Sequence, residues 1–243
     1  MLDYRQTAVD WANDPTDIIV LPIGALEQHG SHLPLDTDTT IANYAARIIA
    51  EHFRAALLPA LPIATSFEHS GYRGTFSLRP ETLMAIIRDL SREAEEQSFR
   101  IMIVVNGHGG NFSLAPVIRD INRQDRPLKI LLSALSAPLP EIFATRRTGA
   151  MDMHSGEIET SIMMQITGRD YPAPPSGGRQ GALEQPDLNT FGIGWLNDQG
   201  VPGHPELASR EKGAAALEII FRNEIARLQE RITMLRENPR YHR

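Results

Sequence analysis

The chain has 243 residues, of which 42% are hydrophobic and 22% charged, proportions that are ordinary for a globular protein with one or two domains. A net charge of −6 disfavours nucleic-acid binding, and the absence of Cys excludes disulfides, thiolate ligands and a cysteine nucleophile. No apolar run approaches the roughly 20 residues of a membrane span and the start of the chain lacks a signal-peptide core, so we expect no membrane partner and, by default, a cytoplasmic location.

Short apolar runs alternate with amphipathic segments along the chain. The predicted strands are 18–23, 56–63, 100–105 and 128–133, the second weakened by two prolines. The predicted helices are 40–53, 80–97, 113–122, 157–167 and 210–237. Strands that alternate with helices predict an α/β fold with a mostly parallel sheet covered on both faces, and the length favours one domain over 1–243.

The segment 171–205 is rich in Pro and Gly and has no periodic pattern. A loop of this length predicts a lid, a binding loop or a subunit contact. Phe191 and Trp195 are candidates for the wall of a substrate pocket, although both are equally compatible with a core. The apolar stripe of the last helix predicts packing on its own domain or on a neighbouring subunit.

Three short segments concentrate the residues that bind metals. The first, 27–39, follows a predicted strand and includes Glu27, His29 and Asp38, a mixture of carboxylate and imidazole that suits zinc or manganese. Ligands of open α/β sheets bind beyond the carboxyl ends of strands, which is where this loop begins. The alternative interpretation is a solvated polar loop.

The second segment, NGHGGN at 106–111, follows another predicted strand and places His108 among glycines. It indicates a metal or substrate loop, with a phosphate loop or a plain turn as alternatives. The third, HSGEIETS at 154–161, places Glu157 three residues after His154, so a helix starting here would bring both to one face. On that helix Glu159 would point elsewhere. His69 follows the second strand region and is a further candidate for the same cleft.

Together these segments resemble the creatininase family, through ExHGxHLPLxxD at 27–38, NGHGGN at 106–111 and HSGExETS at 154–161. The resemblance implies a three-layer α/β/α fold, two divalent ions (Zn and/or Mn) and a hexameric homo-oligomer. It also implies that Glu27 and His108 bind one ion, that His29 binds the other and that Asp38 bridges them.

The chain departs from the creatinine-hydrolysing members of that family at Gly109 and Gly110, where they carry an aromatic residue and a metal-binding Glu. A replacement carboxylate is then needed, and Glu157 is the first candidate, with Glu159 as the alternative. The wall of the pocket would be formed by His69, Gly109 and Trp195.

The predicted activity is hydrolysis of a C–N amide bond, outside peptides, in a small or cyclic substrate by a metal-activated water. His154 is the predicted proton donor to the leaving nitrogen, Glu157 is predicted to assist, and Asp36 and His32 are expected to orient the ligands. Alternatives are a deformylase acting on a formamido-pyrimidine, a trimming peptidase or, in a different class, a nucleotide-binding module.

Overall fold

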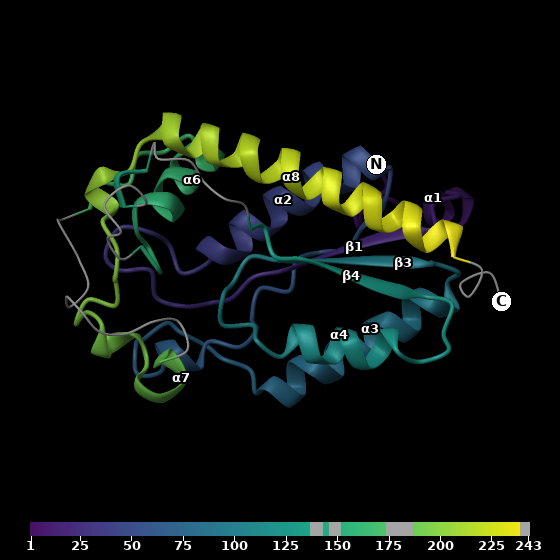
Figure 1. The fold of residues 1–243 in the computed structure, drawn as a ribbon, viewed down its shortest axis with the longest axis horizontal. Helices are drawn as coiled ribbons and strands as arrows, with labels where there is room; N and C mark the ends of the chain where they lie inside the picture. The colour runs from purple at the N-terminus through teal and green to yellow at the C-terminus, as the bar shows by residue number, and fades with distance from the viewer. Residues whose placement is uncertain (137–142, 146–151, 174–186, 239–243) are drawn as a thin grey trace.

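A parallel four-stranded sheet forms the centre of the protein in a computed structural model that describes residues 1–136, 143–145, 152–173 and 187–238. The strand order is β2-β1-β3-β4 and every neighbouring pair is parallel (Figure 1). The predicted parallel sheet is therefore confirmed. The strands are β1 (Ile18–Ile23), β2 (Ala56–Leu57), β3 (Ile101–Asn106) and β4 (Lys129–Ser133).

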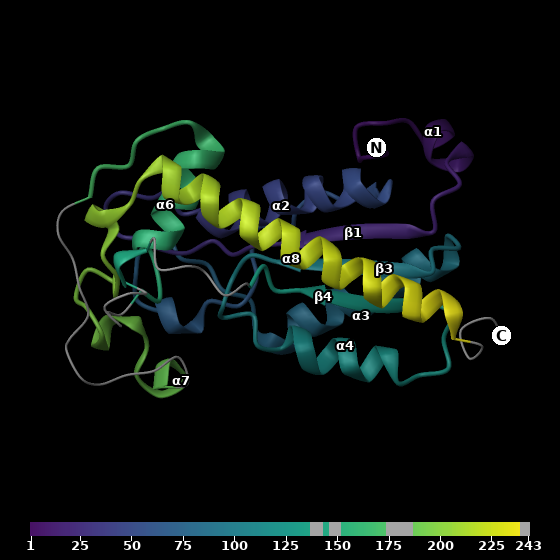
Figure 2. The same ribbon diagram turned by 45° about the horizontal axis from the view of Figure 1, so that its top comes forward.

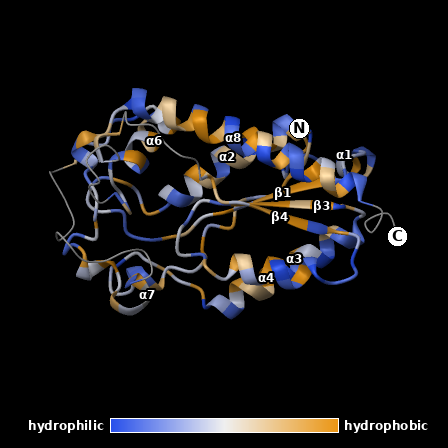
Figure 3. Cartoon of the chain, viewed as in Figure 1, coloured by the Kyte–Doolittle hydropathy of each residue, from blue (hydrophilic) through white to orange (hydrophobic). Residues whose placement is uncertain are grey.

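Helices cover both faces of this sheet, because successive strand side chains point to opposite sides and both sets are apolar. On one face Ile19, Leu21 and Met102 share a core with α3 (Pro80–Glu96) and α4 (Leu114–Asn122). The other face packs on α2 (Thr37–Phe53) and α8 (Arg210–Glu237). Figure 2 shows α8 crossing the sheet, and Figure 3 shows the apolar strands between the helical layers. The three-layer α/β/α prediction is confirmed.

The elements differ from the predictions mainly at their ends. The second strand is confined to Ala56–Leu57, because Pro59 and Pro62 have no N–H groups for a ladder. Helix α2 begins at Thr37, three residues before the predicted start, which places Asp38 in its first turn. A short helix, α1 (Ala8–Asn13), was not predicted; Thr7 and Asp10 cap it reciprocally.

The loops that follow the strands gather at one end of the molecule, at the left of Figure 1. Helix α6 (Glu157–Thr167) packs there against α8, which confirms that the last helix packs on its own chain. The predicted loop region contains three short helical turns, and its part 174–186 lies outside the described residues. These turns are α7 (Leu188–Phe191), η3 (Ile193–Trp195) and η4 (Pro205–Leu207). Within the described ranges, none of the helices has the length and apolar character to cross a membrane.

Candidate metal centre

Two strand ends bring the first two motifs together. β1 and β3 are neighbours with Ile23 opposite Asn106, and the Gly107 N–H donates to the Ile23 carbonyl at 2.9 Å. Gly107 also passes close to the start of α2, where a Cβ would lie 2.5 Å from the Asp38 carbonyl oxygen. A residue without a side chain is needed at this crossing. The loop after β1, the loop after β3 and the first turn of α2 therefore meet at one point.

Glu27, Asp38 and His108 form the first part of the cluster. Glu27 is fully buried, and its Oε2 lies 3.1 Å from His108 Nε2. The other ring nitrogen, His108 Nδ1, lies 3.2 Å from Asp38 Oδ2. One atom from each of these three side chains lies within 4.8 Å of the other two, a spacing that a single ion can span.

His29 and Glu159 form the second part, with Asp38 again between them. His29 Nδ1–H donates to the Glu27 carbonyl at 3.1 Å, so a neutral ring directs its Nε2 lone pair inward. That Nε2 lies 3.4 Å from Asp38 Oδ1 and 3.7 Å from Glu159 Oε1. Ligand atoms about 2.0–2.2 Å from one tetrahedral ion are roughly 3.3–3.6 Å apart, so these distances match a shared ion.

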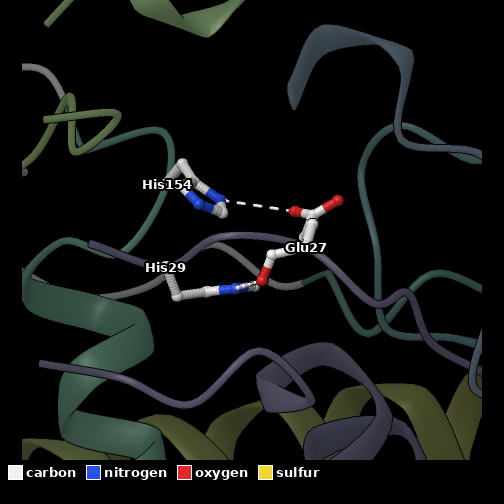
Figure 4. Close-up of side chains that lie close together, drawn as sticks. All are labelled: Glu27, His29 and His154. Carbon is white, nitrogen blue, oxygen red and sulfur yellow. Dashed lines mark hydrogen bonds and ion pairs between the residues drawn. The ribbon is translucent and has the colours of Figure 1, made fainter. Parts of the chain in front are cut away.

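His154 closes the cluster from above, opposite His29 (Figure 4). Its Nε2 lies 2.8 Å from the Gln28 carbonyl, to which a neutral ring donates, and its Nδ1 lies 3.7 Å from Glu27 Oε1. The Nε2 proton, which a general acid would have to transfer, is therefore hydrogen-bonded to a backbone carbonyl. His154 offers the cluster a lone pair, and its predicted role as proton donor is not supported by this geometry.

His69 reaches the cluster, but it contacts Glu27 rather than open space. Gln28 Nε2 donates to the Gly200 carbonyl at 2.8 Å and lies 3.0 Å from His69 Nδ1, which must then be the acceptor. The Gly30 N–H donates to Gln28 Oε1 at 2.9 Å, which fixes the orientation of the amide. His69 therefore carries its proton on Nε2, 3.2 Å from Glu27 Oε1. His69 thus faces a candidate ligand at ion-pair distance.

Several buried polar atoms of the cluster make no hydrogen bond within the described chain. Buried charged atoms without partners cost several kcal/mol, at a rough estimate, unless a counter-charge neutralises them. Divalent cations supply that charge, and the mixed oxygen and nitrogen donors suit zinc or manganese. The residues therefore fit metal ions. The unpartnered atoms are Glu27 Oε1 and Oε2, His29 Nε2, Asp38 Oδ2 and His108 Nε2.

The electrostatics of the cluster show the same need for positive charge. Burial lowers the pKa of His29, but the carboxylates of Glu159 and Asp38 outweigh burial and raise this pKa well above its ordinary range. The pKa of His108 is raised in the same way, because Glu27 and Asp38 outweigh the effect of its burial. Burial raises the pKa of Asp38, yet the two rings hold it far below its usual range. Without metal, the surrounding carboxylates therefore favour protonation of the two rings.

Glu157 lies outside the cluster, so its assignment as replacement ligand is corrected. Its buried carboxylate accepts from the Thr145 N–H at 2.8 Å and from the Ala144 N–H at 3.0 Å, and pairs with Lys212. The predicted helical spacing from His154 fails because α6 begins only at Glu157, after a left-handed turn at Ser155 (φ 54°). That turn directs Glu159 to the cluster instead.

Three further predictions about site residues have different outcomes. Asp36 is exposed and makes no capping hydrogen bond, so it orients no ligand. His32 Nε2 lies 3.1 Å from the Thr160 hydroxyl, behind the cluster. Gly109 borders the small cavity of about 70 Å³ at the cluster, whereas Trp195 lines a larger one outside it.

Glu68 was missed by the sequence analysis. Its side chain is 7% exposed and its Oε1 lies 3.5 Å from His108 Nε2. A Cβ on Gly110 would lie 1.9 Å from that oxygen, so Glu68 occupies the space of a side chain at position 110. The only available signal was the acidic residue next to His69, because nothing local relates position 68 to position 110.

Comparison with known proteins identifies the family. The family described as creatinine amidohydrolase matches residues 3–228. A mycofactocin precursor peptide peptidase of Mycolicibacterium smegmatis is 30% identical over 206 residues, covering 81% of this chain and 78% of the relative. A creatinine amidohydrolase of Pseudomonas putida is 26% identical, covering 83% and 85%.

Solved structures show the same fold. A structure named creatininase Mn has a TM-score of 0.73 at 22% identity, covering 95% of this chain and 98% of that one. A mutant creatininase of Zn-Zn type also has a TM-score of 0.73 at 22% identity, covering 94% and 97%.

The fold and the cluster are those of a metal-dependent hydrolase that acts on C–N bonds. The chain belongs to the creatininase family. This assignment favours the hydrolase over the nucleotide-binding alternative. In agreement, Asn106 and Asn111 direct their side chains to each other and to neighbouring backbone, and His108 points into the cluster.

Proposed function

We propose that the protein hydrolyses an amide bond with two divalent ions that share Asp38. Glu27, Asp38 and His108 would hold one ion, and His29, Asp38 and Glu159 the other. The observation that carries this proposal is the set of buried ligand atoms without hydrogen bonds, together with the fact that two of the three candidate ligand groups have Asp38 in common. The third group joins Glu27, His29 and His154. When bound, such ions supply a hydroxide near neutral pH and polarise the substrate carbonyl.

The chain contributes rigid support for these ligands. Backbone carbonyls orient His29 and His154, and the Gln28 amide sets the proton of His69 towards Glu27. Ligands held in this way lose little freedom on binding a metal or a substrate. The cluster is also enclosed, since Glu27, His29 and His108 are only 0–5% exposed. This burial limits the access of bulk water.

We assign proton transfer to Glu68. Its carboxylate lies beside His108 and borders both the cluster and the larger cavity. It can therefore accept at Oε1 a proton from the water that adds to the amide carbonyl, and return this proton to the leaving nitrogen as the C–N bond breaks. This replaces His154 in that role, because the His154 Nε2–H faces the Gln28 carbonyl.

The experiment combines metal analysis with an amide panel. Protein loaded with Zn or Mn should bind two ions per chain, and the same preparation should cleave at least one of creatinine, formamides, N-acyl amides and short peptides. Asp38→Asn should lose both ions together, because it is common to both groups. One retained ion in that variant would contradict a shared carboxylate. If two ions bind but no amide is cleaved, the proposed metal centre is supported and the proposed reaction is contradicted.

A further inference from the structure

A cavity of about 500 Å³ lies beside the metal centre, and five aromatic residues line it. Its walls come from four separate parts of the chain: the segment 65–72 around the turn η1 (Phe67–His69), the start of α3, the loop before α4, and the α7–η3 region. Its size lies within the range of about 300–1,000 Å³ that small-molecule pockets span. The aromatic lining residues are Phe67, Tyr72, Phe112, Phe191 and Trp195.

Four of these side chains are exposed in the folded chain. Phe67 is 52% exposed, Phe112 49%, Phe191 42% and Trp195 57%. The rings of Phe191 and Trp195 lie 5.2 Å apart and tilted, so they form one continuous wall. Isolated exposed aromatic residues need no explanation, but several around one cavity indicate a surface that an apolar group covers.

The cavity opens onto the cluster. Glu68, Gly110, Leu188 and Ile193 line both this cavity and the 70 Å³ cavity bordered by Asp38, His108 and Glu159. Gly110 has no side chain, so the Glu68 carboxylate is the charged group among these four shared residues. A substituent next to a bond held at the cluster can therefore extend into the aromatic cavity.

The charge of the lining restricts that substituent. Among the described lining residues, Glu68 is the one charged side chain. A phosphate or carboxylate group would meet this carboxylate and aromatic faces, with no cation from the described lining to neutralise it. A neutral apolar ring or chain would instead cover the exposed aromatic surface.

We propose that this cavity is the specificity pocket and that it binds the aromatic side chain of an amino-acid residue next to the hydrolysed amide. The inference rests on the proposed function, because the reacting bond is placed at the metal centre. It adds the substrate class: uncharged peptide-type amides with a bulky aromatic group, in preference to small or phosphorylated ones.

The first test measures kcat/KM of the metal-loaded enzyme for dipeptides and N-acyl amides that differ only in one side chain. We expect Phe to exceed Ala by about 10- to 200-fold, and Asp to be the poorest substrate. Trp195→Ala and Phe191→Ala should lower kcat/KM for the Phe substrate more than for the Ala substrate, and so reduce the preference for Phe. Phe76→Ala is the matched control, since Phe76 is 63% exposed but does not line the cavity.

A binding test separates the pocket from the reaction. Trp11 and Trp195 are the only tryptophans, so Trp11→Phe leaves Trp195 as the sole indole fluorophore. N-acetyl-phenylalaninamide should shift or quench this fluorescence in a saturable way, whereas N-acetyl-alaninamide and phenyl phosphate should not. Saturable binding without cleavage of any amide would retain the pocket and reject the reaction.

Two results would overturn the pocket. One is equal kcat/KM across the side-chain series together with an unchanged Trp195 fluorescence. The other is a lower oligomeric mass for Trp195→Ala in light scattering with an intact substrate preference, because the aromatic surface would then be covered by a second copy of the chain.

Discussion

Glu157 and Glu159 are two residues apart, yet their carboxylates have opposite surroundings. Glu157 is enclosed by backbone N–H groups and Lys212, whereas Glu159 Oε1 lies 3.7 Å from His29 Nε2. The first carboxylate is held by donors outside the cluster, whereas the second accepts from the Ser155 N–H at 2.6 Å on Oε2 and directs Oε1 to the cluster. The two residues therefore form a matched pair of test positions.

Replacing each of them by Gln should give different defects. Glu159→Gln should weaken binding of the second ion by at least about 100-fold, more than the roughly 10–100-fold loss typical of residues that only orient a ligand. Glu157→Gln should keep both ions and lower the free energy of unfolding by about 1–3 kcal/mol, because Lys212 loses its partner. Calorimetric metal titration and denaturant unfolding measure the two effects. Loss of an ion in Glu157→Gln would restore that residue to the metal site.

Glu68 gives a second prediction at this scale. Glu68→Gln keeps the shape next to Gly110 but removes the proton acceptor. We expect kcat to fall by about 100- to 10,000-fold while both ions remain bound, measured on one metal-loaded preparation. A fall in metal content instead would make Glu68 a ligand, and unchanged kcat would remove it from the reaction.

At the scale of elements, helix α8 connects the site to the sheet. Its early turns pack against α6, which carries Glu159, and its later turns contribute Leu228 and Ile232 to the core over the sheet. Arg227 adds a polar anchor by donating to the Leu132 carbonyl at 2.8 Å. The helix thus positions α6 without touching the cluster.

Shortening a buried side chain of α8 should lower the stability of the fold, whereas shortening an exposed one should not. Leu228 is fully buried, so Leu228→Ala should lower the free energy of unfolding by about 2–5 kcal/mol through the cavity it creates. Met234 lies on the same helix and is 55% exposed, so Met234→Ala should change the free energy of unfolding by less than about 0.5 kcal/mol. Denaturant unfolding compares them. Equal effects would mean that the helix does not pack on the sheet in this register.

For the whole molecule, the charge balance of the cluster links metal binding to pH. The pKa values of His29 and His108 are raised well above the ordinary range in the metal-free fold by the neighbouring carboxylates, which favours protonation of these rings. Metal must displace these protons. Its affinity should therefore rise as pH rises, by about tenfold per pH unit for each proton displaced.

Proton release can be counted directly. Titration calorimetry in buffers of different ionisation enthalpy should show at least one proton released per chain at pH 7, and acidification below about pH 6 should release the ions. His52 is exposed on α2, so His52→Ala should leave the count unchanged. An affinity that stays constant between about pH 5.5 and 7.5 would contradict histidine ligation.

The sequence alone was sufficient for the layers and for most of the cluster. Apolar periodicity located β1, β3 and β4, and the ends of parallel strands share one edge of a sheet, so the loops of Glu27 and His108 were expected at that edge. That the two residues bind one ion was implied only by the resemblance to the creatininase family. The hexamer, the single domain and the cytoplasmic location stay predictions, because they depend on surfaces and surroundings that strand and helix patterns do not describe.

Only the tertiary structure selected among the remaining carboxylates. Because of the left-handed turn at Ser155, Glu159 rather than Glu157 lies at the cluster. Where η1 approaches the loop after β3, Glu68 occupies the space of a side chain at position 110. The aromatic cavity likewise joins Phe67, Phe112 and Trp195 from distant parts of the sequence. Local patterns report helix and strand faces, whereas these contacts arise between loops whose approach is set by packing of the whole fold.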